Sequence, residues 1–159
     1  MSDQAQALAE RFERAHKAFV ATVLNLSDAQ WQTYCPEEER TVAALTWHVA
    51  SAYGVETAAL RAMAIGQPVE VWARDALDRS NAEDGATYAD CDRAETVELL
   101  RGNGAAAASF VRSLSDEQLA RRGRYLEDLP DWTVAEWIGR VLVGHPEIHL
   151  RSIRAALDL

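Results

Sequence analysis

Apolar residues recur every three to four positions through four long stretches of this 159-residue chain. In the first stretch they are Leu8, Phe12, Ala15, Phe19, Val23 and Leu26. Such spacing places them on one face of an α-helix, which turns once every 3.6 residues. Similar patterns predict helices over residues 41–65, 93–114 and 133–157. We expect no strands, because no stretch alternates with period two and no Asn-Gly or Asp-Gly turn joins two β-branched runs.

Four long amphipathic helices predict an all-α fold, a four-helix bundle that forms one domain over residues 1–159. Residues 66–87, which connect the second and third helices, form a segment longer than most loops. We therefore expect this connection to contain a short helix or to have a functional role.

The chain carries a net charge of −9. This charge disfavours binding to nucleic acids and to anionic membrane surfaces. No apolar run approaches the roughly 18–20 residues that span a bilayer, and the N-terminus has no basic segment followed by an apolar one. Cys35 and Cys91 are too few for a disulfide framework and lie at no metal-ligand spacing, so we expect reduced thiols in a cytoplasmic protein.

Two short segments recur in the second half of the chain. Residues 26–30 (Leu-Ser-Asp-Ala-Gln) match residues 114–118 (Leu-Ser-Asp-Glu-Gln), each at the end of a predicted long helix. Residues 41–45 (Thr-Val-Ala-Ala-Leu) match residues 133–137 (Thr-Val-Ala-Glu-Trp), each at the start of the next one. The pattern predicts two similar helix–loop–helix halves, with the second and fourth helices in equivalent positions.

Three of the four histidines lie on the second and fourth predicted helices. His145 and His149 are four residues apart and therefore share a helix face. His48 lies among apolar residues, where an imidazole needs partners for its ring nitrogens. One interpretation is a metal site in which each imidazole supplies one nitrogen and at least one coordination position stays open. The alternative is a lone core histidine, His48, and a pair at a solvated helix end.

The pattern Thr-Val-Ala-x-Leu-x-x-His from Thr41 to His48, and His-x-x-x-His-Leu-x-x-Ile-Arg from His145 to Arg154, resemble those of the DinB-like superfamily. Residues 77–82 and 95–100 extend the resemblance over about residues 5–157. This superfamily of four-helix bundles includes DinB/YfiT-like metal-dependent hydrolases and the N-terminal domains of mycothiol-dependent maleylpyruvate isomerases. The resemblance implies a divalent metal bound by His48, His145 and His149.

One feature sets the fourth helix apart from an ordinary one: Gly144 and Pro146 flank His145. A proline inside a helix removes one backbone hydrogen bond and usually kinks the axis. We expect the four-residue spacing to hold, with a distorted turn between His145 and His149 as the alternative.

A three-histidine site allows two kinds of function. The first is a metal-dependent enzyme that acts on a small molecule by hydrolysis, or by thiol-dependent transfer or isomerisation with a low-molecular-weight thiol as cosubstrate. The second is a non-catalytic bundle, expressed under stress, that binds a metal, a small molecule or a partner protein. Zinc or nickel suits three imidazoles best, and iron is also suitable. By analogy with its relatives, we expect the protein to form a homodimer.

Other residues are weaker candidates for the site. His16 is expected to be a partly exposed structural residue. Glu56 can accept a hydrogen bond from a ligand or act as a base, but a solvated carboxylate is the simpler expectation. Asn81 is expected to cap a helix rather than line a pocket. The tryptophans near helix starts are expected in the core: Trp47, Trp132 and Trp137.

Overall fold

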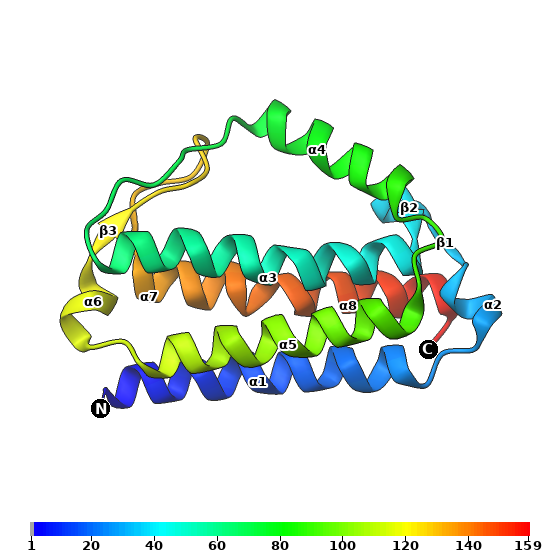
Figure 1. The fold of residues 1–159 in the computed structure, drawn as a ribbon, viewed down its shortest axis with the longest axis horizontal. Helices are drawn as coiled ribbons and strands as arrows, with labels where there is room; N and C mark the ends of the chain where they lie inside the picture. Colours follow the sequence, from blue (N-terminus) through cyan, green and yellow to red (C-terminus); the bar gives the residue numbers. More distant parts are fainter. Residues whose placement is uncertain (1) are drawn as a thin grey trace.

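The computed structural model describes residues 2–159 as a bundle of four long helical rods (Figure 1). Three are single helices: α1 (Asp3–Leu24), α3 (Val42–Ala64) and α5 (Arg93–Arg112). The fourth rod consists of α7 (Val134–Trp137), the π-helical segment η2 (Ile138–Leu142) and α8 (Gly144–Leu157). The predicted all-α four-helix bundle is confirmed. Within residues 2–159, none of these helices is both long enough and apolar enough to cross a membrane.

Each half of the chain contains a short helix and a small hairpin between its long helices. In the first half these are α2 (Asp28–Trp31), β1 (Tyr34–Cys35), the 3₁₀ turn η1 (Pro36–Glu38) and β2 (Arg40–Thr41). In the second they are α6 (Asp116–Ala120), β3 (Arg122–Gly123) and β4 (Trp132–Thr133). Both hairpins are antiparallel, so the expectation of no strands is wrong here. Strands of two residues are too short to show period-two alternation.

The structure confirms the repeat seen in the sequence. Ser27 and Ser115 each form a capping box at the start of α2 and α6. Thr41 and Thr133 accept backbone hydrogen bonds at the N-termini of α3 and α7. The four-residue difference between the halves falls in the hairpin loops, which are residues 36–39 and 124–131. Local capping chemistry therefore starts α3 and α7 in the same way.

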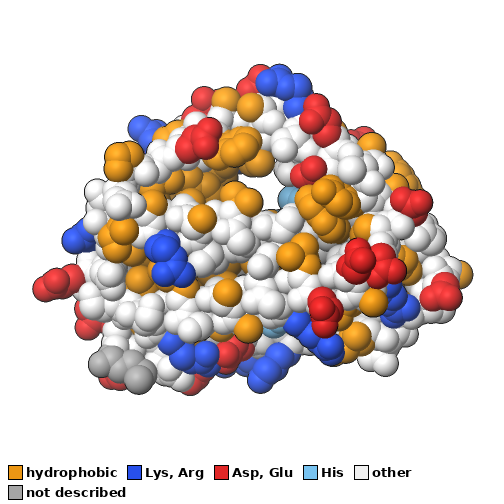
Figure 2. Space-filling model, in the orientation of Figure 1, with side chains coloured by type: hydrophobic (Ala, Val, Ile, Leu, Met, Phe, Trp, Pro, Cys, Tyr) orange, Lys and Arg blue, Asp and Glu red, His pale blue; other side chains and the backbone are white. Residues whose placement is uncertain are grey.

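The long connection contains a full helix, α4 (Arg74–Thr87), which arches above α3 and has no buried residue (Figure 1). At one end, Trp47 stacks on Tyr88 with ring centroids 3.4 Å apart. At the other, Trp72 donates a backbone hydrogen bond to the carbonyl of Tyr125 (2.9 Å). Asn81 lies inside α4, so the expectation that it caps a helix is wrong; the N-cap is Ala73. The molecular surface has a hollow between α3 and α4. Part of a histidine side chain is visible in this hollow, and hydrophobic side chains lie at its rim (Figure 2).

All four rods contribute to one core. Its large, fully enclosed side chains include Phe12, Phe19, Tyr53, Leu60, Leu100, Trp137 and Ile153. Of the three tryptophans expected in the core, only Trp137 is buried; the other two are half-buried.

Two apolar residues of the long rods, Val55 and Ile148, lie outside the core. Val55 is 60% exposed, because α3 is apolar around most of its circumference and its pattern does not select one face. Ile148 is 50% exposed, because the π turn rotates α8 relative to a continuous α-helix.

Candidate metal centre

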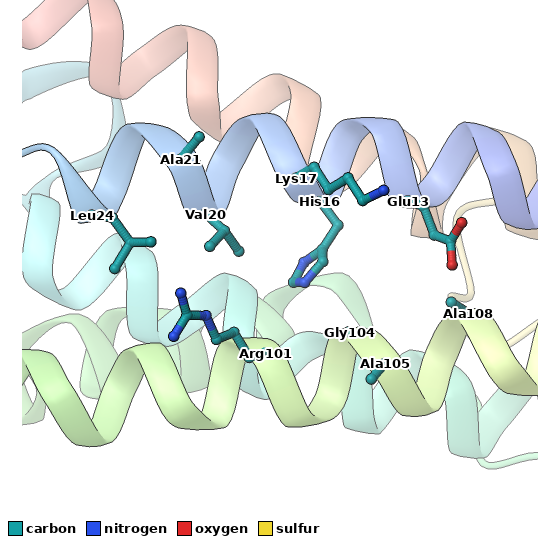
Figure 3. Close-up of a pocket in the computed structure, with 10 residues that line it drawn as sticks. All are labelled: Glu13, His16, Lys17, Val20, Ala21, Leu24, Arg101, Gly104, Ala105 and Ala108. Carbon is teal, nitrogen blue, oxygen red and sulfur yellow. The ribbon is translucent and has the colours of Figure 1, made fainter.

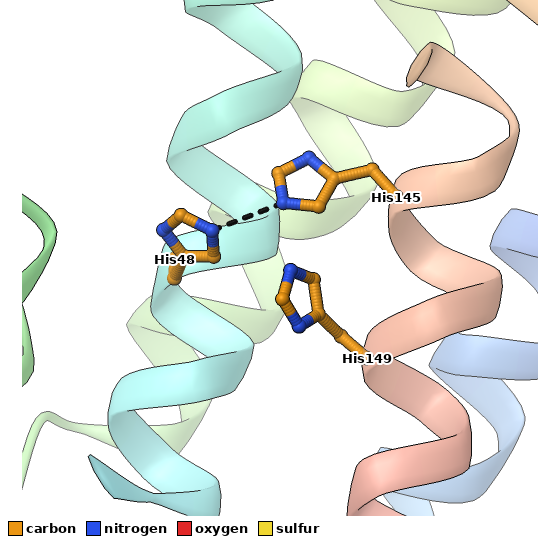
Figure 4. Close-up of side chains that lie close together, drawn as sticks. All are labelled: His48, His145 and His149. Atoms are coloured by element: carbon orange, nitrogen blue, oxygen red, sulfur yellow. Dashed lines mark hydrogen bonds between the residues drawn. The ribbon is translucent and has the colours of Figure 1, made fainter. Parts of the chain in front are cut away.

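The structure brings together the three histidines that the sequence singled out. His48 comes from α3, and His145 and His149 come from α8 (Figure 4). One ring nitrogen from each lies within 4.8 Å of the others, and Nε2 of His48 is 3.0 Å from Nε2 of His145. His48 is therefore no isolated core histidine, and the pair on α8 does not line a solvated helix end.

The spacing of these nitrogens suits a metal ion. Imidazole nitrogens lie about 2.0–2.1 Å from zinc, so two ligands at angles of roughly 90–110° are about 3 Å apart. The 3.0 Å between His48 and His145 matches that separation. Three protein ligands also leave a coordination position for water or substrate. Within residues 2–159, this is the one group of His, Cys, Asp and Glu side chains with metal-ligand spacing.

The Gly144–Pro146 flank does not disturb the histidine pair. Pro146 has no backbone N–H, so it cannot donate a hydrogen bond to the carbonyl of Leu142, four residues earlier. The π-helical segment η2 ends at Leu142. The backbone N–H of Val143 donates to the carbonyl of Ile138, five residues back, at 2.9 Å, which is the hydrogen-bond spacing of a π-helix. The irregular turn thus precedes α8, and the predicted four-residue geometry holds. Short π-helical turns of this kind frequently lie at functional sites.

Two carboxylates lie behind the imidazoles. Oε1 of Glu56 is 2.7 Å from Nδ1 of His145, although the ring N–H is poorly aligned for a hydrogen bond. Oε1 of Glu38 is 2.9 Å from Nδ1 of His149. A carboxylate at one ring nitrogen fixes the imidazole and leaves the other nitrogen free for a metal. The expectation that Glu56 is a solvated carboxylate is wrong, since it is buried on the inner face of α3.

Glu38 is the residue of this site that the sequence does not predict. It lies in the hairpin loop just before α3, 111 residues from its histidine partner. Glu37 and Glu39 beside it are exposed, and only the turn geometry selects Glu38 for the interior. No residue pattern in the chain marks it.

Burial and charge set the protonation of the site. Burial, and then the charges of His145 and His149, lower the pKa of His48 to about 2. Burial also lowers the pKa of His149, although Glu38 opposes this shift. For His145, burial disfavours the charged form, but the contact with Glu56 and the charges of Glu56 and Glu38 together outweigh it and raise the pKa. Burial raises the pKa of Glu38, yet the hydrogen bond and charge of His149, together with Ser152 and Arg40, outweigh it and bring the pKa to about 2. His48 and His149 therefore keep the neutral form that binds metals.

The remaining candidates lie elsewhere. His16 lines an open groove between α1 and α5, outside the histidine cluster. Burial raises the pKa of the Cys35 thiol to about 11. The Cys91 thiol contacts the carbonyl of Ala43 at 3.5 Å. None of the three side chains belongs to the histidine cluster.

Residues 11–153 match the family model of the DinB superfamily. No curated protein matches the chain in sequence.

Three solved structures share the fold. One is YfiT from Bacillus subtilis, described as a probable metal-dependent hydrolase with an unusual four-helix bundle topology (TM-score 0.78, 17% identity, 99% of this chain and 89% of that one). The second is the sibling lethal factor precursor DfsB (TM-score 0.77, 19% identity, 99% and 97%). The third is an uncharacterized protein from Clostridium difficile 630 (TM-score 0.77, 17% identity, 100% and 98%).

Proposed function

The chain belongs to the DinB superfamily, and we propose that it is a metal-dependent hydrolase of a small molecule, with its metal centre at His48, His145 and His149. The observation that carries the proposal is the convergence of three imidazole nitrogens. Two of these imidazoles each have a carboxylate at the other ring nitrogen, Glu56 at His145 and Glu38 at His149. The fold shared with YfiT, a probable metal-dependent hydrolase, supports it.

The side chains at this centre have two different roles. The histidines supply nitrogen lone pairs, and Glu56 and Glu38 hold two of the rings in place. The hollow between α3 and α4 gives a small molecule a route to the imidazoles (Figure 2). A divalent metal in such a site polarises a substrate carbonyl and lowers the pKa of water to near 7. Zinc or nickel fits the three-imidazole ligand set best.

Metal analysis of protein purified without added metal tests the ligand assignment. We expect about one divalent ion per chain in the wild type and far less in His145→Ala, because two imidazoles seldom retain a metal. His16→Ala is the matched control, since it removes the one histidine outside the cluster. Full retention of metal by a folded His145→Ala protein would refute the assignment.

The reaction class needs a separate assay with zinc-loaded protein. Hydrolysis predicts turnover of activated esters or amides without any thiol, lost in His145→Ala. Turnover only in the presence of a low-molecular-weight thiol would instead identify a thiol-dependent transferase or isomerase. Bound metal with no turnover of either kind would favour the non-catalytic bundle.

A further inference from the structure

Four buried oxygen atoms near Glu56 have no hydrogen-bond partner among residues 2–159. They are Oε2 of Glu56 and the hydroxyl oxygens of Tyr53, Thr57 and Tyr125. These four are more than half of the seven buried side-chain nitrogen and oxygen atoms without a partner in this part of the chain. Such atoms are rare in folded proteins, because each one gives up its hydrogen bonds to bulk water and gains none in return. Their concentration in one region of the core calls for a common explanation.

The four oxygens lie around one turn of α3. Glu56 and Thr57 follow Tyr53 by three and four residues, so these buried side chains are neighbours on the helix surface. Tyr125 comes from the loop between β3 and β4. Burial raises the pKa of Tyr53 and of Tyr125, and the negative charge of Glu56 raises both further. Both hydroxyl groups therefore lie near this carboxylate.

Packing holds both tyrosine rings in place. The ring of Tyr125 lies against Trp137, with ring centroids 4.3 Å apart. The ring of Tyr53 packs edge-on against Phe12 and against His16, whose own ring projects between α1 and α5 (Figure 3). Both tyrosines are buried, so their hydroxyl groups do not reach bulk solvent for a partner. Any partner has to lie inside the core.

Ordered water has the hydrogen-bonding capacity that these oxygens need. A buried water molecule typically makes about three hydrogen bonds, as donor and as acceptor. It can donate to the carboxylate of Glu56 and accept from a tyrosine hydroxyl, and it joins polar atoms that are too far apart for a direct bond. A second metal ion fits less well. The histidine cluster is the one group of His, Cys, Asp and Glu side chains within residues 2–159 that has metal-ligand spacing.

We propose that an internal water site lies behind Glu56, where ordered water joins Oε2 to the hydroxyl groups of Tyr53 and Tyr125. The other carboxylate oxygen, Oε1, lies 2.7 Å from Nδ1 of His145. Water bound to Oε2 holds the carboxylate from behind and keeps Oε1 directed at the imidazole. Tyr53 and Tyr125 are thus positioning residues for His145, a role that rests on the proposed metal centre.

Thermal unfolding of Tyr125→Phe, with and without zinc, tests the water site. This change removes only the hydroxyl group and keeps the ring against Trp137. A hydroxyl bonded through water stabilises the fold, so we expect the Tm to fall by about 2–6 °C. Removing a hydroxyl that has no partner would raise the Tm or leave it unchanged, and that result would refute the proposal. Tyr34→Phe is the control, because Tyr34 is 55% exposed and should keep the wild-type Tm.

Zinc affinity, measured by competition with a chelator, tests the positioning role. We expect Tyr125→Phe and Tyr53→Phe to bind zinc about three- to tenfold more weakly than the wild type, and Tyr34→Phe to bind it equally. Wild-type affinity in both tyrosine variants of the core would refute the role.

A double variant shows whether Tyr125 acts through Glu56. In Tyr125→Phe/Glu56→Gln the loss of zinc affinity should be smaller than the product of the two single losses, because both changes act on one carboxylate. Losses that multiply in full would refute the proposal. A wild-type protein without zinc affinity would refute the proposed function alone, since the Tm comparison without zinc needs no metal centre.

Discussion

Replacing Glu56 by glutamine tests what its carboxylate does for the metal centre, because the two side chains have nearly the same shape. Oε1 lies 2.7 Å from Nδ1 of His145, and the carboxylate is buried. Glutamine keeps the volume but removes the negative charge behind the imidazole. We therefore expect His145 to become a weaker metal ligand in Glu56→Gln.

The expected loss of metal affinity follows from what a carboxylate hydrogen-bonded to a metal-binding histidine contributes. Loss of a carboxylate behind a metal-bound histidine typically costs about 10–100-fold in metal affinity, which is about 1.4–2.8 kcal/mol. At a fixed metal excess, the stability of the metal-loaded protein falls by the same amount. For a domain of this size the expected drop in Tm is about 3–11 °C.

Zinc competition with a chromophoric chelator at neutral pH measures the zinc affinity. Thermal unfolding with and without zinc measures how much bound zinc stabilises the protein. Glu136→Gln is the matched control, since Glu136 belongs to the capping box at Thr133 and glutamine also completes such a box. Wild-type zinc affinity in Glu56→Gln would show that the buried carboxylate does not support the metal centre.

Three further predictions concern other side chains. Glu38→Gln should weaken zinc binding about tenfold or more, whereas Glu37→Gln, on the exposed side of the same turn, should not; equal affinities in the same competition assay would contradict this. In denaturant titrations, Gly104→Ala should lower the free energy of unfolding by about 1–3 kcal/mol because its methyl group overlaps the ring of His16. In Gly102→Ala the added methyl group meets open space on α5, so the free energy of unfolding should rise by up to about 1 kcal/mol. A loss of stability in Gly102→Ala would show that overlap with His16 does not explain the effect of Gly104→Ala. As pH falls below 6.5, unfolded His16 gains a proton before the folded form does, since burial lowers its folded pKa, so the free energy of unfolding decreases. His16→Phe should reduce that slope by up to about 1.4 kcal/mol per pH unit, and parallel profiles would rule out this contribution.

Local sequence patterns determined the helices and their starting points. The recurrence of apolar residues located the long rods, and the serine and threonine caps that start α2, α3, α6 and α7 are visible as the repeat. The spacing of His145 and His149 places them on one helical face. These features depend on contacts within a few residues, so the chain's short-range periodicity is enough to reveal them.

Tertiary structure alone decided which side chains support the site. The inward turn of Glu38 and the burial of Glu56 depend on how α3 and the first hairpin pack against α8. The contact between His48 and His145 joins residues 97 positions apart. No periodic pattern encodes such distances, because they are fixed only when the helices pack together. The sequence by itself therefore predicted the bundle and its three metal-ligating candidates, while the packed structure placed the two carboxylates behind them and rotated α8 through the π turn.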